Sequence, residues 1–130
     1  MAAKQRYVQV GMGGRSSMFV NALAGSHKEH GELLAMCDVN QTRMDLHNRR
    51  RSEADAPPLP TYKAEAFDEM VERHKPDGVI VTTKDCFHHQ YIVRAMELGC
   101  RAITEKPMTT DAEKCQAILD TVARTGRRLT

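Results

Sequence analysis

The fold of this chain is decided by residues 6–16, which read RYVQVGMGGRS. The first five of them hold two valines and a tyrosine and predict a strand, because β-branched and aromatic side chains fit a pleated, half-buried surface. The strand runs into three glycines, and after them apolar residues recur at helical spacing, at Met18, Phe19, Ala22 and Leu23. A strand, a glycine-rich turn and a helix in this order are typical of the first unit of an α/β sheet.

The same alternation continues along the chain. Further strands are predicted at residues 33–37, 78–81 and 101–104, with one more beginning at 129–130, and helices at 17–27, 41–53, 64–74, 87–98 and 111–124. The proline-rich stretch at 56–60 breaks regular structure between the second and third helices. Strands that alternate with helices imply right-handed crossovers and a mostly parallel sheet with helices on both faces. The sequence therefore predicts an α/β, Rossmann-type doubly wound fold.

Length and composition narrow the classes of function. The 130 residues suit one domain, and 41% hydrophobic with 28% charged residues is close to the globular average. The formal net charge is only +2, and basic residues cluster only at 49–51, so nucleic acid is not expected as a partner. No apolar run reaches the roughly 20 residues of a membrane helix and no signal-peptide core follows Met1, so no membrane partner is expected.

The four cysteines show no C-x-x-C spacing. They lie in or beside apolar segments, at Cys37, Cys86, Cys100 and Cys115, which predicts reduced thiols and a cytoplasmic protein. His88 and His89 are adjacent but have no cysteine or carboxylate at ligand spacing, so no metal site is expected.

The glycine-rich turn has the features of a phosphate-binding loop. Gly11 permits a tight turn, and Gly13 and Gly14 let backbone N–H groups approach a pyrophosphate at the N-terminus of the helix, beside Arg15. Ser16 replaces the third glycine of the usual pattern and is small enough for close helix–strand contact. A plain structural turn would explain two of the glycines, but the context favours dinucleotide binding.

The end of the second strand indicates which dinucleotide binds. Asp38 stands where a carboxylate accepts hydrogen bonds from the ribose hydroxyls of NAD and repels the 2′-phosphate of NADP. Arg43, which follows closely, could neutralise a phosphate or stack on adenine. NAD is therefore favoured, and NADP stays open.

Two further clusters follow strands. Residues 82–89 read TTKDCFHH after the strand at 78–81, and residues 104–107 read TEKP at the end of the strand at 101–104. Because ligands of open parallel sheets bind beyond the carboxyl ends of the strands, we expect both clusters to meet the glycine loop at one edge.

Taken together, these segments resemble the N-terminal domain of the oxidoreductase family named for glucose-fructose oxidoreductase, inositol dehydrogenase and rhizopine catabolism (Gfo/Idh/MocA). The resemblance covers nearly the whole chain and rests on GMGGR at 11–15, CDV at 37–39, TKDCFH at 83–88 and LGCRAITEKP at 98–107. Its most specific part is the E-K-P segment. Lys84 and Asp85 depart from the family pattern, which usually has proline and asparagine there.

The resemblance implies an NAD(P)-dependent oxidoreductase that transfers a hydride to or from a sugar, a polyol or a related alcohol. Lys106 is by match the catalytic lysine near the nicotinamide and the substrate hydroxyl, where partial desolvation would favour proton transfer. His88 matches the family's histidine and is the second catalytic candidate. The expected cofactor-binding set is Gly11, Gly13, Gly14, Arg15, Asp38, Arg43, Thr82, Thr83, His88, Glu105 and Lys106.

Members of the family also carry a C-terminal α/β domain with the substrate pocket and usually the oligomer interface. We expect this domain to be absent from the chain, with residues 1–130 forming the NAD(P)-binding domain and its sixth strand cut at the C-terminus. A small-molecule substrate and homo-oligomers through the absent domain are expected. Two other functions stay open: an NAD-dependent glycosidase of the same family, and a non-catalytic dinucleotide-binding or regulatory module.

Overall fold

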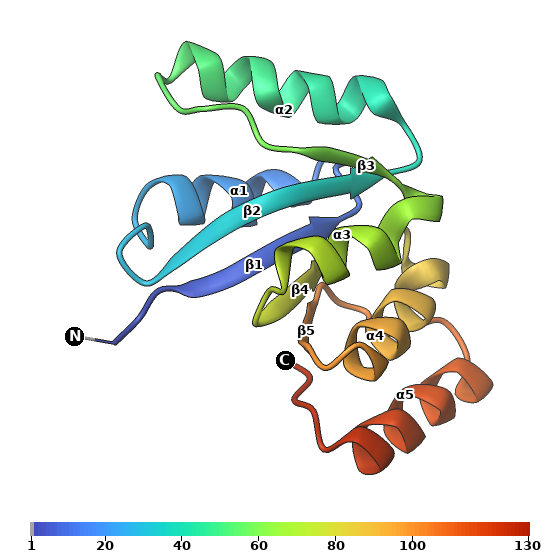
Figure 1. Cartoon of the computed structure of the whole chain (residues 1–130). Helices are drawn as coiled ribbons and strands as arrows, with labels where there is room; N and C mark the ends of the chain where they lie inside the picture. The colour runs from blue at the N-terminus through green and yellow to red at the C-terminus, as the bar shows by residue number, and fades with distance from the viewer. Residues whose placement is uncertain (1) are drawn as a thin grey trace.

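A computed structural model describes residues 2–130, in which five parallel strands form one sheet in the order β3-β2-β1-β4-β5 (Figure 1). The strands are β1 Gln5–Val10, β2 Gly31–Asp38, β3 Thr61–Lys63, β4 Gly78–Val81 and β5 Arg101–Thr104. The strand order reverses between β1 and β4, and this is where ligands of such sheets bind. The predicted α/β class is confirmed.

Helices cover both faces of the sheet, as predicted. One face carries α1 Ser16–Ala24 and α2 Gln41–Glu53; the other carries α3 Phe67–His74, α4 His88–Glu97 and α5 Ala112–Thr125 (Figure 1). Short 3₁₀ turns, η1 Ala64–Ala66 and η2 Asp85–Phe87, lead into α3 and α4. Asn40 and Asp111 cap α2 and α5 by accepting from the backbone N–H of Arg43 and Lys114.

The hydrophobic core has two parts, one on each side of the sheet. Alternation along β1 sends Val8 and Val10 toward α3 and α4, whereas Leu33 and Met36 of β2 pack with α1 and α2. Along the predicted run LLAMC the alternation is interrupted: Leu33 and Met36 are three residues apart yet lie on the same side, because the register shifts between the pairs Tyr7–Leu33 and Val8–Ala35. The extra residue is a β-bulge.

Strand β3 is absent from the sequence prediction. It is three residues long, directly after the prolines, and pairs in parallel with Met36–Asp38 of β2. A strand this short shows no period of its own, and tertiary pairing alone defines it. Helix α1 was expected to reach residue 27 but ends at Ala24, where the N–H of Gly25 bonds to the carbonyls of Asn21 and Ala22.

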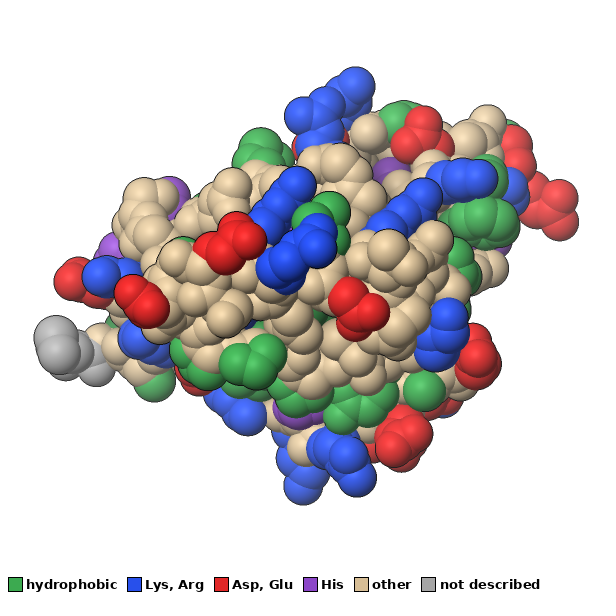
Figure 2. All heavy atoms as spheres, turned by 90° about the horizontal axis from the view of Figure 1, so that it is seen from above, with side chains coloured by type: hydrophobic (Ala, Val, Ile, Leu, Met, Phe, Trp, Pro, Cys, Tyr) green, Lys and Arg blue, Asp and Glu red, His purple; other side chains and the backbone are tan. Residues whose placement is uncertain are grey.

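At the other end of the chain, Leu129 pairs in parallel with Ala102 of β5, where the sequence predicts a further strand. None of the helices in residues 2–130 has the length and apolar character that crossing a bilayer requires. On the face seen in Figure 2, basic and acidic side chains are interspersed rather than gathered in one basic stripe.

Candidate functional site

The carboxyl ends of β1, β2, β4 and β5 meet at one edge of the sheet, where two neighbouring cavities open. The first, of about 350 Å³, lies between residues 11–15 (the glycine loop), the end of β2 and the loop after β4. The second, of about 200 Å³, lies between the glycine loop, the loop after β4 and residues 105–107. Both cavities are lined by Arg15, Thr82 and Thr83. The clusters singled out in the sequence therefore converge as expected.

Gly11 is required by the chain's own packing. Its φ is +88°, and a Cβ there would lie 2.5 Å from the backbone of Thr82 and Thr83. Its N–H donates to the carbonyl of Cys37 at 2.8 Å, and its carbonyl accepts from the Thr82 hydroxyl at 2.6 Å. Gly11 thus joins β1 to the ends of β2 and β4.

Gly13 and Gly14 are not required by packing. A Cβ on either would have no atom within 4 Å. Within residues 2–130, the backbone N–H groups of Gly13, Gly14 and Arg15, called here the free amides, donate to no protein acceptor. They precede α1, whose N-cap Arg15 offers no side-chain cap, so donors and the positive end of the helix face the first cavity. This cradle fits a pyrophosphate.

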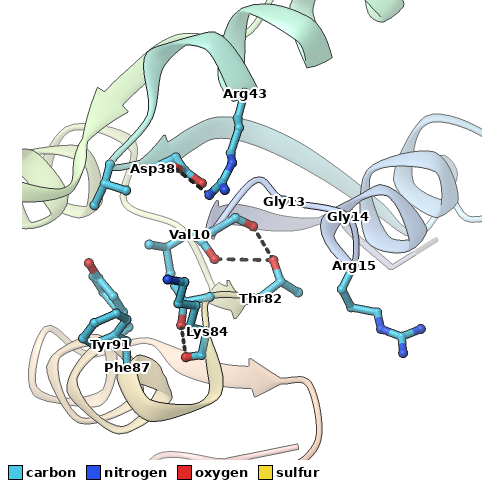
Figure 3. A pocket seen from close by; sticks show the side chains of 13 residues that line it. Val10, Gly13, Gly14, Arg15, Asp38, Arg43, Thr82, Lys84, Phe87 and Tyr91 are labelled. Atoms are coloured by element: carbon cyan, nitrogen blue, oxygen red, sulfur yellow. Dashed lines mark hydrogen bonds and ion pairs between the residues drawn. The ribbon is translucent and has the colours of Figure 1, made fainter.

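Asp38 lies at the far side of the loop with only 4% of its surface exposed. Its Oδ2 accepts from the N–H of Met12 at 2.6 Å and its Oδ1 from the N–H of Asn40 at 2.7 Å. Arg43 Nη1 lies 3.7 Å from Oδ1, and Figure 3 shows the pair at the cavity wall. A carboxylate has about four acceptor positions, so Asp38 keeps capacity for a ribose hydroxyl.

The opposite wall of the first cavity is aromatic. Phe87, 46% exposed, and Tyr91 lie across from Asp38 and Arg43 (Figure 3). Burial raises the pKa of the Tyr91 phenol, so the ring stays neutral. Neither residue was among the predicted cofactor-binding residues, although Phe87 belongs to the cluster at 82–89. The signal that could have found them is their closeness to the TTKD cluster.

Thr82 and Thr83 serve different contacts. The buried Thr82 hydroxyl accepts from Gln9 Nε2 at 3.0 Å. It donates to the carbonyl of Gly11, so it holds the glycine loop against the end of β4 (Figure 3). Thr83 offers its carbonyl to His88. Gln9 itself is fully buried near the carboxyl end of β1 and was not predicted; a glutamine between two valines of a core strand is the signal for it.

His88 is 1% exposed and joins two segments of the site. Its Nδ1 lies 2.9 Å from the carbonyl oxygen of Pro107, and its Nε2 lies 3.1 Å from that of Thr83. Both neighbours are acceptors, so a neutral ring can donate to only one of them. The imidazole therefore faces backbone on both sides and holds the loop after β4 against the segment after β5.

Glu105 connects the glycine loop to the catalytic candidate. Its Oε1 lies 3.6 Å from Nε of Arg15, and its Oε2 accepts from the backbone N–H of Lys106 at 2.9 Å. The Lys106 side chain is exposed beside the second cavity and forms no ion pair within residues 2–130. The partial desolvation expected for this lysine is not supplied by the described part of the chain.

His47 of α2 also supports the site, although little in the sequence around it indicates this role. It is 5% exposed, and its Nε2 lies 3.0 Å from the Ser16 hydroxyl and 3.2 Å from the carbonyl of Met12. The only local signal is its spacing of three residues from the buried Met44.

Other reactive groups near the site are inert or isolated. Burial and the neighbouring Asp38 raise the pKa of the Cys37 thiol to about 12, so it carries no thiolate at neutral pH. All four cysteines are free. Residues 2–130 hold no group of three or more His, Cys, Asp or Glu side chains that could bind a metal ion.

Comparison with known proteins agrees with this geometry. The family model described as an oxidoreductase family with an NAD-binding Rossmann fold matches residues 5–130. YteT of Bacillus subtilis (strain 168), named as an oxidoreductase, is 32% identical over 88% of this chain. The α-N-acetylgalactosaminidase of Shewanella oneidensis is 30% identical over 98% of it. The chain covers 26% and 28% of these proteins, so it spans about a quarter of their length.

Solved structures show the same fold. The WlbA dehydrogenase from Chromobacterium violaceum, in complex with NADH and UDP-GlcNAcA, has a TM-score of 0.85 at 23% identity, covering 98% of this chain and 34% of that one. The scyllo-inositol dehydrogenase from Lactobacillus casei, with NAD(H) and scyllo-inositol, has a TM-score of 0.82 at 22% identity, covering 98% and 36%. With the family model matched over nearly its whole length, the chain belongs to the Gfo/Idh/MocA oxidoreductase family, as an NAD-binding Rossmann domain.

Proposed function

We propose that residues 1–130 form the cofactor domain of an NAD-dependent oxidoreductase acting on a hydroxyl group of a sugar, a polyol or a related alcohol. One observation carries the proposal: the free amides, the Asp38 carboxylate and Lys106 line two neighbouring cavities along one edge of the sheet. When bound, NAD supplies the hydride acceptor. The chain itself supplies binding, orientation and a group that moves a proton.

The first cavity suits the adenosine half of the cofactor. The free amides donate to the pyrophosphate, and Asp38 accepts from the ribose hydroxyls, while Phe87 and Tyr91 offer a flat wall to adenine. The charge of Asp38 opposes a 2′-phosphate, which favours NAD over NADP. Arg43 is 3.7 Å away and partly offsets that charge, so NADP is the second cofactor to test.

Lys106 is the residue that we assign to proton transfer. Its side chain is exposed beside the second cavity and pairs with no carboxylate of the part of the chain that the structure describes, whereas Glu105 fixes its backbone. A substrate hydroxyl beside this lysine can exchange its proton with Nζ. His88 is assigned a positioning role, because both of its ring nitrogens already face backbone carbonyls.

The substrate class follows from the relatives. The solved neighbours are named with UDP-GlcNAcA and scyllo-inositol, and this chain covers 34% and 36% of their length. We propose that a second domain in a longer protein completes the substrate pocket and provides the oligomer interface. Four free cysteines suit a cytoplasmic protein.

An NAD-dependent glycosidase is the second candidate, favoured by relatives named α-N-acetylgalactosaminidase and glycosyl hydrolase family 109 protein at about 30% identity. The oxidoreductase and the glycosidase are distinguished by measuring the NADH formed while the protein acts on polyols, nucleotide sugars and an aryl N-acetylgalactosaminide. Accumulation of NADH with an alcohol supports the oxidoreductase. Release of the aryl group without net NADH supports the glycosidase, and a chain that fails to bind NADH contradicts both.

A further inference from the structure

We infer that His47 is a positioning residue for the cofactor, which fixes the glycine loop from below so that the free amides keep one common direction. The inference rests on the proposed binding of pyrophosphate at that loop. His47 lines neither cavity, so it does not touch the cofactor and can act only through Met12 and Ser16.

The contacts form a continuous chain of hydrogen bonds. With a hydrogen on Nε2, the His47 ring shares this one N–H between the Met12 carbonyl at 3.2 Å and the Ser16 hydroxyl at 3.0 Å. The Ser16 hydroxyl then donates to the carbonyl of Gly13 at 2.5 Å. One side chain on α2 thereby holds the two carbonyls that flank the first free amide.

The remaining groups of the loop are held by other elements. The N–H of Met12 donates to Asp38, and the carbonyl of Gly11 accepts from Thr82. With His47 in place, every peptide group from the N–H of Gly11 to the carbonyl of Gly13 has a partner, except the N–H of Gly13. Such fixed donors lose little entropy when they meet an anion. Loss of His47 would leave the Met12 carbonyl without its partner, and this carbonyl belongs to the Met12–Gly13 peptide, where we propose that the phosphate binds.

The surroundings of His47 keep its ring in the neutral form. Burial lowers the pKa of the imidazole and outweighs the hydrogen bond to the Met12 carbonyl, which raises it; Arg50 on α2 lowers the pKa further, and Asp38 on β2 raises it. Met44, three residues earlier on α2, is also buried. A glutamine can reproduce the Nε2 donor of a neutral ring, whereas a leucine fills the space without it.

The test measures the binding of NADH, ADP and adenosine by calorimetry. His47→Leu is expected to weaken NADH and ADP about 10-fold, because the free amides are no longer held in place, while adenosine, which has no phosphate, changes less than about twofold. His47→Gln should stay within about threefold of wild type for all three. His74→Leu is the matched control: that histidine also has a pKa lowered by burial, but it contacts Tyr62 on the other face of the sheet.

Ser16→Ala provides a second route that leaves the α2 core intact. It removes the hydroxyl that connects His47 to the Gly13 carbonyl, while the Ser16 N–H still donates to that carbonyl at 3.2 Å, and it should weaken ADP by a few-fold, with adenosine again unchanged. If His47→Leu or Ser16→Ala binds ADP with wild-type affinity, the inference about His47 is wrong, whereas the proposed function stands. A His47→Gln protein as weak as His47→Leu, or a parallel loss of adenosine, also overturns the inference, since either assigns His47 to general packing. A wild-type chain that binds neither NADH nor ADP overturns the proposed function as well.

Discussion

The two glycines of the loop, Gly11 and Gly13, should respond to substitution in opposite ways. At Gly11, an alanine would have to adopt φ of +88° and place its Cβ 2.5 Å from the backbone of Thr82 and Thr83. The left-handed conformation costs about 1–2 kcal/mol. Displacing backbone that cannot rotate away costs a further 1–3 kcal/mol or so, by analogy with overpacked cores.

Gly11→Ala is therefore expected to lower the free energy of unfolding by about 2–5 kcal/mol, a decrease in Tm of about 10 °C for a domain of this size. At Gly13, a Cβ meets no atom within 4 Å and φ is not left-handed, so Gly13→Val should leave Tm unchanged or slightly raised. The valine instead occupies the space of the ligand. Loss of two hydrogen bonds to a charged pyrophosphate, each about 1.5–3 kcal/mol, should raise the Kd for NADH at least 100-fold or so.

The assay combines thermal unfolding by circular dichroism with NADH titration by fluorescence, on both variants and wild type. Gly14→Ala, which also has open space, is a milder control for the loop. If Gly13→Val binds NADH as tightly as wild type, the loop is only a turn and the cofactor lies elsewhere. If Gly13→Val unfolds as early as Gly11→Ala, the division between a structural and a ligand-binding glycine is wrong.

Three further predictions concern Asp38, Lys106 and the two histidines His47 and His74. Asp38→Ala should weaken the binding of NAD by about 10–100-fold, because a charge-assisted hydrogen bond is lost, and it should reduce the preference for NAD over NADP. Calorimetry with both cofactors checks this. An unchanged preference would mean that the carboxylate serves only its bonds to Met12 and Asn40. Lys106→Met should keep NADH affinity but lower kcat by about 10²–10⁴-fold in a form of the protein that turns over substrate, and a near wild-type rate would assign proton transfer to another group. Because burial lowers the pKa of His47 and His74 from 6.5, their contribution to stability is present above that value and is lost as the pH falls below it. Urea unfolding at several pH values should show this loss, and a His47→Gln, His74→Gln protein with an unchanged pH dependence would contradict it.

The sequence predicted much of this fold because its signals are local. The spacing of apolar residues along 78–81 and 101–104 matches β4 and β5 residue for residue, and α2 likewise begins and ends where its pattern does. Strand β3 was missed because its three residues gain their conformation only by pairing with β2. The β-bulge opposite Tyr7 was missed for the same reason, since register depends on two strands at once.

The site, like the fold, was predicted from local signals in part, and the rest depends on contacts between distant segments. The sequence by itself determined which residue types lie at the carboxyl ends of the strands, because glycine, aspartate and lysine at strand ends are visible as soon as the strands are. It also assigned His88 to the site, but only the tertiary structure revealed that both ring nitrogens face backbone carbonyls.

Contacts between distant segments were decided by the tertiary structure alone. His47 lies about thirty residues from Ser16 in the chain, and Gln9 lies more than seventy from Thr82, yet each pair shares a hydrogen bond under the glycine loop. A period of two or 3.6 residues reports which face of an element is buried, whereas the partner on that face depends on sheet order, register and helix placement. Those are properties of the assembled chain, and they decide how the loop is held.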